Sequence, residues 1–327
     1  MFRAVLLVSL ARLVLSSPLE KTLPKNDEEG DIHAVIVVGS EGFDNYRHQA
    51  NGCHAYHVLR EHGVKEENII TMMYDNIVND TLNPHRGKLF HDPSFKRDVY
   101  DGCQIDYKGK NVTVENFIHV LTGNKTNEVQ RVLNSTENDR VFVYYTDHGG
   151  KRLLQFPDNL LTDKQLLDVL KTMQTKRMFK EMLLFVDACF SGSMVEETLN
   201  GFDNILALTS ANNNESSYET YCYNISGSLM EWCLASQFGA AWMEYAEAND
   251  LNEKTIKEQY DYVRVRTNES HAGMYGNKEM GKKRISEFLG TKLPKVNRTL
   301  DLTKARPYTT TSECPAHGKR CQNCKGE

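Results

Sequence analysis

The chain has 327 residues, and its 39 Lys and Arg against 44 Asp and Glu give a formal charge of −5. With 40% hydrophobic and 25% charged residues it has the composition of an average soluble globular protein. This excludes a disordered tail protein, a collagen-like chain and a polytopic membrane protein. We expect no nucleic acid as partner, because phosphate binding requires a clustered basic face. The length allows one large domain or two small ones.

Residues 1–16 predict a secretory signal peptide, since Arg3 precedes an apolar run and the small Ser16 offers a cleavage point. Arg12 interrupts the run, and the alternative is a membrane anchor. An anchor needs a stretch of about 18 apolar residues, which this segment lacks. We therefore expect the secretory pathway and no membrane span after signal removal. The destination is either a lysosome-like acidic compartment or the extracellular space.

Eight Asn-x-Ser/Thr sequons favour the same route, and none has Pro at its middle position. We predict glycosylation at these asparagines. They are Asn79, Asn111, Asn124, Asn134, Asn214, Asn224, Asn268 and Asn297.

Residues 292–327 form a polar tail with few apolar residues, which predicts disorder. Four of its residues have the types of a zinc-ligand set: Cys314, His317, Cys321 and Cys324. One short isolated cluster has no flanking scaffold, so we favour incidental cysteines and predict no metal site.

The middle of the chain alternates short apolar runs with helical patterns. Five runs that do not alternate in polarity predict strands covered on both faces: Ala34–Val38, Asn68–Met73, Val141–Tyr145, Met182–Val186 and Ile205–Thr209. Helical spacing predicts helices over Gln49–Glu61, which Gly63 terminates, and over Val114–Leu121, Asp163–Met173 and Glu231–Ala246. Such alternation predicts an α/β fold over residues 31–291, with a mainly parallel central sheet and helices on both faces.

Residues able to carry chemistry follow two of these strands. His148 lies three residues past Tyr145, and Cys189 lies three residues past Val186. In α/β sheets, sites form beyond the carboxyl ends of strands, so neighbouring strands would bring the two side chains together. A thiol needs a nearby base or cation to become a nucleophile, and histidine supplies one. Each residue alone would suggest a buried cysteine or a loop histidine, but the pair favours catalysis.

The motifs Thr-Asp-His-Gly at 146–149 and Ala-Cys-Phe-Ser-Gly-Ser-Met at 188–194 resemble those of the legumain family, the asparaginyl endopeptidases. Further segments match from about residue 31 to residue 290, among them 45–50, 53–56, 72–75, 98–100 and 242–244. The resemblance implies a caspase-like α/β fold and a cysteine endopeptidase that cleaves proteins and peptides after Asn. It also implies no metal or organic cofactor, a side activity in peptide ligation, and cystatin-type inhibitors as partners.

The resemblance also implies the role of each catalytic residue. Cys189 is the expected nucleophile and His148 the general base and acid. Asn45 matches the family residue that orients the histidine, as a carboxylate does in other triads. The backbone N–H of Gly149, with that of Cys189, is the expected oxyanion hole.

The specificity pocket departs from the family. Arg47 and His48 match its basic side, and an Arg fork suits a carbonyl oxygen. On the acidic side, Asp187 stands where the family usually has Glu, and Ser236 stands where it has Asp. Since the pocket loses one negative charge, we expect a weaker preference for Asn over Asp.

Family zymogens continue into a linker and a helical prodomain, whereas this sequence ends at Glu327. We expect this sequence to be a fragment, a splice form or the product of a lineage without the prodomain.

Cys222 and Cys233 match a disulfide of many family members. Cys53 lies on a helix face with apolar neighbours and is expected in the core, and Cys103 has no predicted role.

Two alternative functions remain. The altered pocket fits a catalytically impaired secreted homologue that binds peptides or inhibitors. The related catalytic subunit of the GPI transamidase is disfavoured, because its Gly-His-Gly and Asp-Thr-Cys patterns are absent here.

Overall fold

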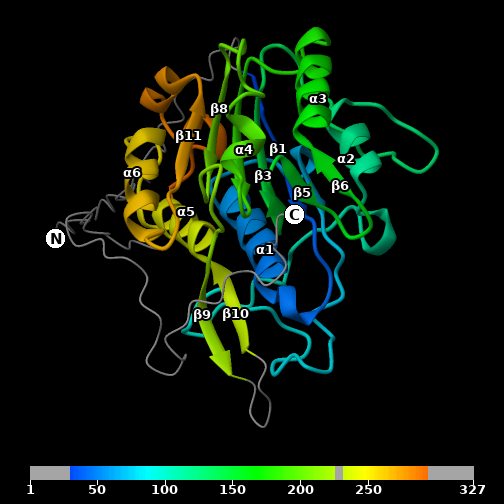
Figure 1. Cartoon of the computed structure of the whole chain (residues 1–327), viewed down its shortest axis with the longest axis vertical. Coiled ribbons are helices and arrows are strands. Elements are labelled where there is room, and N and C mark those ends of the chain that lie inside the picture. Colours follow the sequence, from blue (N-terminus) through cyan, green and yellow to red (C-terminus); the bar gives the residue numbers. More distant parts are fainter. Residues whose placement is uncertain (1–29, 225–230, 294–327) are drawn as a thin grey trace, which may run out of the picture.

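The structure is a computed structural model that describes residues 30–224 and 231–293 (Figure 1). The predicted signal peptide at 1–16, nearly all of the predicted tail and the sequon at Asn297 lie outside the described residues.

A six-stranded sheet in the order β11-β8-β7-β3-β1-β2 forms the centre of the fold. Its strands are β1 (Ile32–Val38), β2 (Ile69–Met72), β3 (Arg140–Thr146), β7 (Glu181–Asp187), β8 (Ile205–Thr209) and β11 (Gly273–Gly276). Every pairing is parallel except that of β11 with β8. All five predicted strands are present, and the mainly parallel α/β prediction is confirmed. The edge strand β11 was not predicted, because its sequence Gly-Met-Tyr-Gly has little strand character.

Helices cover both faces of this sheet. The helices are α1 (Tyr46–Glu61), α2 (Val114–Leu121), α3 (Asp163–Thr175), α4 (Gly192–Val195), α5 (Gln237–Ala248), α6 (Ile256–Arg266) and α7 (Ser286–Leu289). Short 3₁₀ helices lie at Phe43–Asn45, Glu66–Asn68, Gly109–Asn111 and Lys278–Lys282. Figure 1 shows α2 and α3 on the opposite flank of the molecule from α6. None of the helices in the described part of the chain is both long and apolar enough to cross a membrane.

The alternation of side chains along β1 and β3 explains why the apolar runs are continuous. Val35 and Val143 pack in one core cluster with α2 and α3, whereas Ile36 and Phe142 pack in the other with α1 and α5. All four side chains are at most 2% exposed. Burial of both sheet faces requires apolar residues at successive positions.

Local signals fix the starts of several helices. Thr162 caps α3 by accepting a hydrogen bond from the N–H of Gln165, and the Gln165 side chain accepts from Thr162 N–H in return. Thr255 and Glu258 form the same capping box at α6. Gly63 has a φ of +96° just after α1, a conformation that favours glycine, as predicted.

The predicted helix over Glu231–Ala246 is wrong in its first part. Residues Glu231–Ser236 form strand β10, which pairs antiparallel with β9 (Glu219–Asn224) in a hairpin that projects from the main body (Figure 1). Helix α5 starts only at Gln237, because Ser236 acts as its N-cap and accepts from Gly239 N–H at 3.0 Å. A third sheet of three strands, β4 (Gly149–Gly150), β5 (Leu153–Gln155) and β6 (Leu160–Thr162), was also not predicted.

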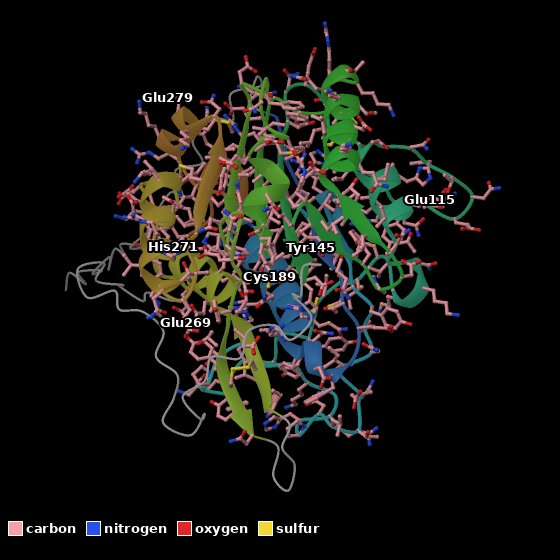
Figure 2. The ribbon with its side chains drawn as sticks, in the orientation of Figure 1. Glu115, Tyr145, Cys189, Glu269, His271 and Glu279 are labelled. Atoms are coloured by element: carbon pink, nitrogen blue, oxygen red, sulfur yellow. A yellow bond between two sulfur atoms is a disulfide. The ribbon has the colours of Figure 1, made fainter. Side chains whose placement is uncertain are left out.

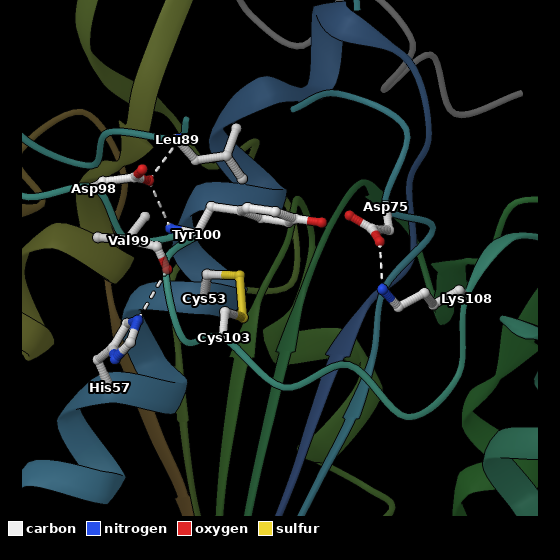
Figure 3. Close-up of a disulfide and its surroundings, with 9 residues drawn as sticks. All are labelled: Cys53, His57, Asp75, Leu89, Asp98, Val99, Tyr100, Cys103 and Lys108. Carbon is white, nitrogen blue, oxygen red and sulfur yellow. Dashed lines mark hydrogen bonds and ion pairs between the residues drawn. A yellow bond between two sulfur atoms is a disulfide. The ribbon is translucent and has the colours of Figure 1, made fainter. Parts of the chain in front are cut away.

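Cys53 lies in the core, as expected, with no exposed surface. It also forms a disulfide with Cys103, which was not predicted, with a Cα–Cα distance of 5.4 Å across 50 residues of sequence (Figure 3). Pairing across so long a separation cannot be deduced from sequence spacing. Beside the bond, the carbonyl of Val99 lies 3.0 Å from His57 Nε2. Both contacts attach the segment after β2 to α1. Cys222 and Cys233 form the disulfide implied by the resemblance, across the β9–β10 hairpin.

Candidate active site

The two candidate catalytic residues leave the same edge of the central sheet. Strands β3 and β7 are parallel neighbours, with Thr146 opposite Asp187 at their carboxyl ends. Past this pair, the N–H of Asp147 donates to the carbonyl of Asp187 at 3.1 Å. His148 and Cys189 each lie two residues past the end of their strand, and Figure 2 labels Cys189 and Tyr145, the last but one residue of β3. The sheet therefore brings the two loops together, as the strand ends predicted.

Asn45 determines the tautomer of His148. Asn45 lies at the end of the first 3₁₀ helix, and its Nδ2 donates to the carbonyl of Glu41 at 2.8 Å. Its Oδ1 is thereby identified as the acceptor that lies 2.7 Å from His148 Nε2. Nε2 must carry the hydrogen, so Nδ1 holds the lone pair. This Nδ1 is buried and has no hydrogen-bond partner among the described residues.

Burial keeps the histidine neutral. Desolvation, and secondarily the charge of Arg47, lowers the pKa of His148 to about 3. A neutral imidazole with a bare Nδ1 is the form that a general base requires, and here it persists at mildly acidic pH.

Gly149 lies against the backbone of the candidate nucleophile. A Cβ at this position would be 2.4 Å from the carbonyl oxygen of Cys189 and 3.0 Å from the Cβ of Ala188. No side chain fits in that space, so the glycine is required by close approach rather than by backbone conformation. This brings the peptide before Gly149 next to the Cys189 loop, where an oxyanion hole is expected.

Cys189 is only 1% exposed, and the hydroxyl of Ser217 donates to its sulfur at 3.8 Å. The next residue, Phe190, has a φ of +56°, so the chain turns sharply just after Cys189. The Cys189 sulfur is in a disulfide in this structure. Its reaction as a nucleophile therefore requires the reduced thiol.

Arg47 and His48 lie in the first turn of α1, where the ring of His48 is 5.1 Å from that of His148. Arg47 donates to the carbonyl of Asp44 at 3.0 Å, and its Nε lies 3.5 Å from a carboxylate oxygen of Glu219. His48 Nδ1 lies 2.7 Å from the hydroxyl of Ser40 and 3.2 Å from Asp147 Oδ1. The pKa of His48 lies well below its ordinary value, chiefly because of burial. Arg47 is thus the charged group on this side.

Asp187 and Ser236 are in direct contact. The Ser236 hydroxyl donates to Asp187 Oδ2, which also accepts from the Tyr144 hydroxyl at 3.2 Å. Burial raises the pKa of Asp187 to about 6, although the hydrogen bonds from Ser236 and Tyr144 oppose this shift. Ser236, which the resemblance places where the family has Asp, is therefore a hydrogen-bond donor to Asp187.

Sequence reasoning missed several residues of this site. Burial raises the pKa of Asp147 to about 8, so this carboxyl beside His148 is protonated at neutral pH. Its position in the Thr-Asp-His-Gly motif, next to His148, was the signal in the sequence that could have identified it as a site residue. Glu219 beside Arg47 and Ser217 beside Cys189 had no such signal, because β9 and the segment before it are distant in sequence from both strand ends.

One group of described residues has the donor types of a metal site. Ligand atoms of His48, Asp147 and His148 lie within 4.8 Å of one another. Two of the available nitrogens already have partners, since His48 Nδ1 contacts Ser40 and His148 Nε2 contacts Asn45. Hydrogen bonds hold both histidines, and burial favours the protonated carboxyl of Asp147, which is a poor metal ligand, so we assign no metal to this group.

Comparisons with known proteins identify the family. Residues 32–291 match the Peptidase C13 family. The chain is 42% identical to "Hemoglobinase" from Schistosoma japonicum, covering 89% of this chain and 68% of that protein. It is 39% identical to "Legumain" from Rattus norvegicus (90% and 69% covered) and 38% identical to "Vacuolar-processing enzyme beta-isozyme" from Arabidopsis thaliana (92% and 67% covered). The solved structure of caspase-1 from Spodoptera frugiperda aligns over 81% of this chain and 94% of its own, with a TM-score of 0.44 and 13% identity. The chain therefore belongs to the peptidase C13 family and is a cysteine endopeptidase.

Proposed function

We propose that this peptidase cleaves after Asn, and also after Asp, through a dyad of Cys189 and His148. The observation that carries the proposal is the hydrogen bond from His148 Nε2 to Asn45. It leaves a bare Nδ1 at the sheet edge from which the Cys189 loop also departs. Neutral imidazole and reduced thiol at one strand edge make up the minimal machinery for acyl transfer.

The reaction proceeds through an acyl-enzyme. His148 Nδ1 takes the proton of the Cys189 thiol, and the thiolate attacks the carbonyl carbon of the scissile bond. The backbone N–H groups of Gly149 and Cys189 stabilise the negative oxygen of the tetrahedral intermediate. The C–N bond then breaks, and His148 returns the proton to the leaving amine. Water attacks the thioester to release the acid; an amine that replaces water gives peptide ligation instead.

Specificity follows from the charges around the substrate side chain. The guanidinium of Arg47 offers donors to the side-chain oxygen of Asn or Asp, and Asp187 offers an acceptor to the amide N–H of Asn. Ser236 brings no second negative charge. Although Glu219 lies 3.5 Å from Arg47, the pocket has one carboxylate fewer than the family pattern, which supports tolerance of Asp.

A peptide-library digest with product sequencing tests the proposal under mild reducing conditions. We expect cleavage after Asn, with Asp as the second residue, and no cleavage by a folded Cys189→Ala variant. A thiol-directed active-site probe distinguishes this function from that of a peptide-binding homologue. If the reduced protein is folded and Cys189 does not react, the catalytic proposal is wrong.

We further propose that the protein travels the secretory pathway as a glycoprotein, to an acidic lysosome-like compartment or the cell exterior. The asparagines of all seven sequons in the described part of the chain are exposed, which supports their access to glycosylation. Loss of mass on glycosidase treatment of secreted material tests this. We also propose that cystatin-type inhibitors bind the enzyme. Inhibition of the peptide-library digest by such an inhibitor tests this.

A further inference from the structure

A chain of buried hydrogen bonds starts at the acidic side of the proposed pocket and runs into the protein. Ser236, which donates to Asp187, accepts from Asn51 Nδ2 at 2.8 Å. Asn51 lies on α1 and is fully buried; its Oδ1 lies 2.7 Å from Nε2 of His91. His91 is 3% exposed and comes from the segment that follows β2. None of these contacts is needed for the catalytic dyad.

The series of hydrogen bonds continues from His91 to the protein surface. Nδ1 of His91 lies 2.8 Å from Nδ1 of His54, and the two rings meet edge to face with centroids 4.5 Å apart. His54 lies one turn after Asn51 on α1, and its Nε2 lies 2.8 Å from Oε1 of Glu247. The same oxygen accepts from Arg97 at 2.7 Å. The Arg97 side chain is 34% exposed, so this series of hydrogen bonds connects the proposed pocket to a charged group that solvent can reach.

The orientation of the Asn51 amide fixes the first proton positions. The backbone N–H of Ser236 points at Asn51 Oδ1 at 3.4 Å, which identifies that atom as oxygen. Asn51 Nδ2 donates one hydrogen bond to the hydroxyl of Ser236 and one to the hydroxyl of Thr146. Since Oδ1 can only accept, His91 must carry its hydrogen on Nε2.

The remaining protons follow from the state of His91. Burial, with the charges of His54 and Arg97, holds the pKa of His91 well below its ordinary value, so its Nδ1 is a bare acceptor. His54 must then donate from Nδ1 to His91. Its Nε2 faces a carboxylate oxygen of Glu247 that already accepts from Arg97, so Nε2 must donate as well. Both nitrogens of His54 carry hydrogen, and the side chain is an imidazolium.

We propose that Asn51, His91 and His54 are positioning residues that hold Ser236 and Asp187 in place, and that this support is complete only while His54 is doubly protonated. The proposal rests on the proposed function, because it takes Asp187 and Ser236 as part of the substrate pocket. When His54 loses a proton, it must give up either the bond to His91 or the bond to Glu247. The charged and titratable groups around it are His91, Glu247, Arg97, Glu61 and His57.

Nitrogen NMR of ¹⁵N-histidine protein tests the proton positions without any substrate. Signals are assigned by their loss in His54→Gln and His91→Gln variants. From the hydrogen-bond geometry we expect hydrogens on both nitrogens of His54 and on Nε2 alone of His91. A neutral His54, or a hydrogen on Nδ1 of His91, would overturn the proposal. This result does not depend on whether the protein cleaves after Asn.

Kinetics on a matched Asn peptide test the consequence for the pocket. His54→Gln keeps a donor but cannot be charged, and we expect it to raise KM about tenfold at about pH 5 with kcat unchanged. A wild-type KM profile in folded His54→Gln would overturn the proposal.

A matched control separates this role from a general effect on helix α1. His57 lies one turn after His54 and is partly buried. It contacts the carbonyl of Val99 and takes no part in the hydrogen bonds from Ser236 to Glu247. His57→Gln should retain the wild-type KM profile, and an equal change in both variants would count against the proposal. Should wild type show no cleavage after Asn, the proposed function fails and the NMR result alone decides the proton positions.

Discussion

Substitution of Gly149 by alanine tests the arrangement of the two catalytic loops most directly. The added Cβ would lie 2.4 Å from the carbonyl oxygen of Cys189, whereas ordinary contact begins at 3.4 Å. The two loops must therefore separate by about 1 Å. A misplacement of about 1 Å costs on the order of 10²-fold in rate, and loss of one oxyanion donor costs about 10²–10³-fold. We expect kcat to fall by about 10²–10³-fold.

The assay measures kcat and KM on an Asn peptide, with thermal unfolding of each variant as a check on folding. Overpacking at this position should also lower the free energy of unfolding by about 1–3 kcal/mol, so kcat is measured well below the unfolding temperature. Gly150→Ala is the matched control, because the nearest atoms to its Cβ are those of Leu153 at 3.9 Å. It should keep wild-type kcat. A folded Gly149→Ala enzyme within about tenfold of wild-type kcat would refute the reasoning.

Three other predictions follow from the same region and from α1. Asp147, with a pKa raised to about 8, keeps a proton that the unfolded chain loses near about pH 4, so it makes stability fall as the pH rises towards about 8. Below about pH 6.5 the lowered pKa of His148 has the opposite effect, so the fall should be seen between about pH 6.5 and 8, at no more than about 1.4 kcal/mol per pH unit, and urea unfolding of Asp147→Asn should show this slope removed. Ser236→Ala removes the α5 cap, so thermal unfolding should show the free energy of unfolding lowered by about 1 kcal/mol. It also removes a donor that lowers the pKa of Asp187, so the pH profile of KM should show this pKa moved above about 6. Replacement of Cys53 and Cys103 by serine opens a 50-residue loop and should cost about 4 kcal/mol in denaturant unfolding; an unchanged midpoint would show that the bond is dispensable.

Much of the central sheet could be predicted because its strands are buried on both faces. Runs such as Val141–Tyr145 stand out from sequence alone, and their carboxyl ends locate His148 and Cys189 without further information. The β9–β10 hairpin could not be predicted in this way. Its residues Glu231–Ser236 have helical spacing, but cross-strand pairing and the cap at Ser236 override that local preference.

The rest of the site depends on contacts between segments that are distant in sequence. Nothing near Arg47 indicates that Glu219 will lie 3.5 Å away. The raised pKa of Asp147 arises from burial, which only the packed loops create. The pairing of Cys53 with Cys103 likewise requires knowing that the segment after β2 returns to α1.

The Cys53–Cys103 disulfide also determines how the protein should be produced. Helix α1 carries Arg47 and His48 at its start and Cys53 two turns later, so an unoxidised protein would lack the covalent bond between α1 and the long segment before β3. A bacterial cytosol keeps thiols reduced, whereas the periplasm or a eukaryotic secretory host forms disulfides. Material refolded from inclusion bodies should therefore have its Cys53–Cys103 bond verified by peptide mapping before its activity is compared with that of secreted protein.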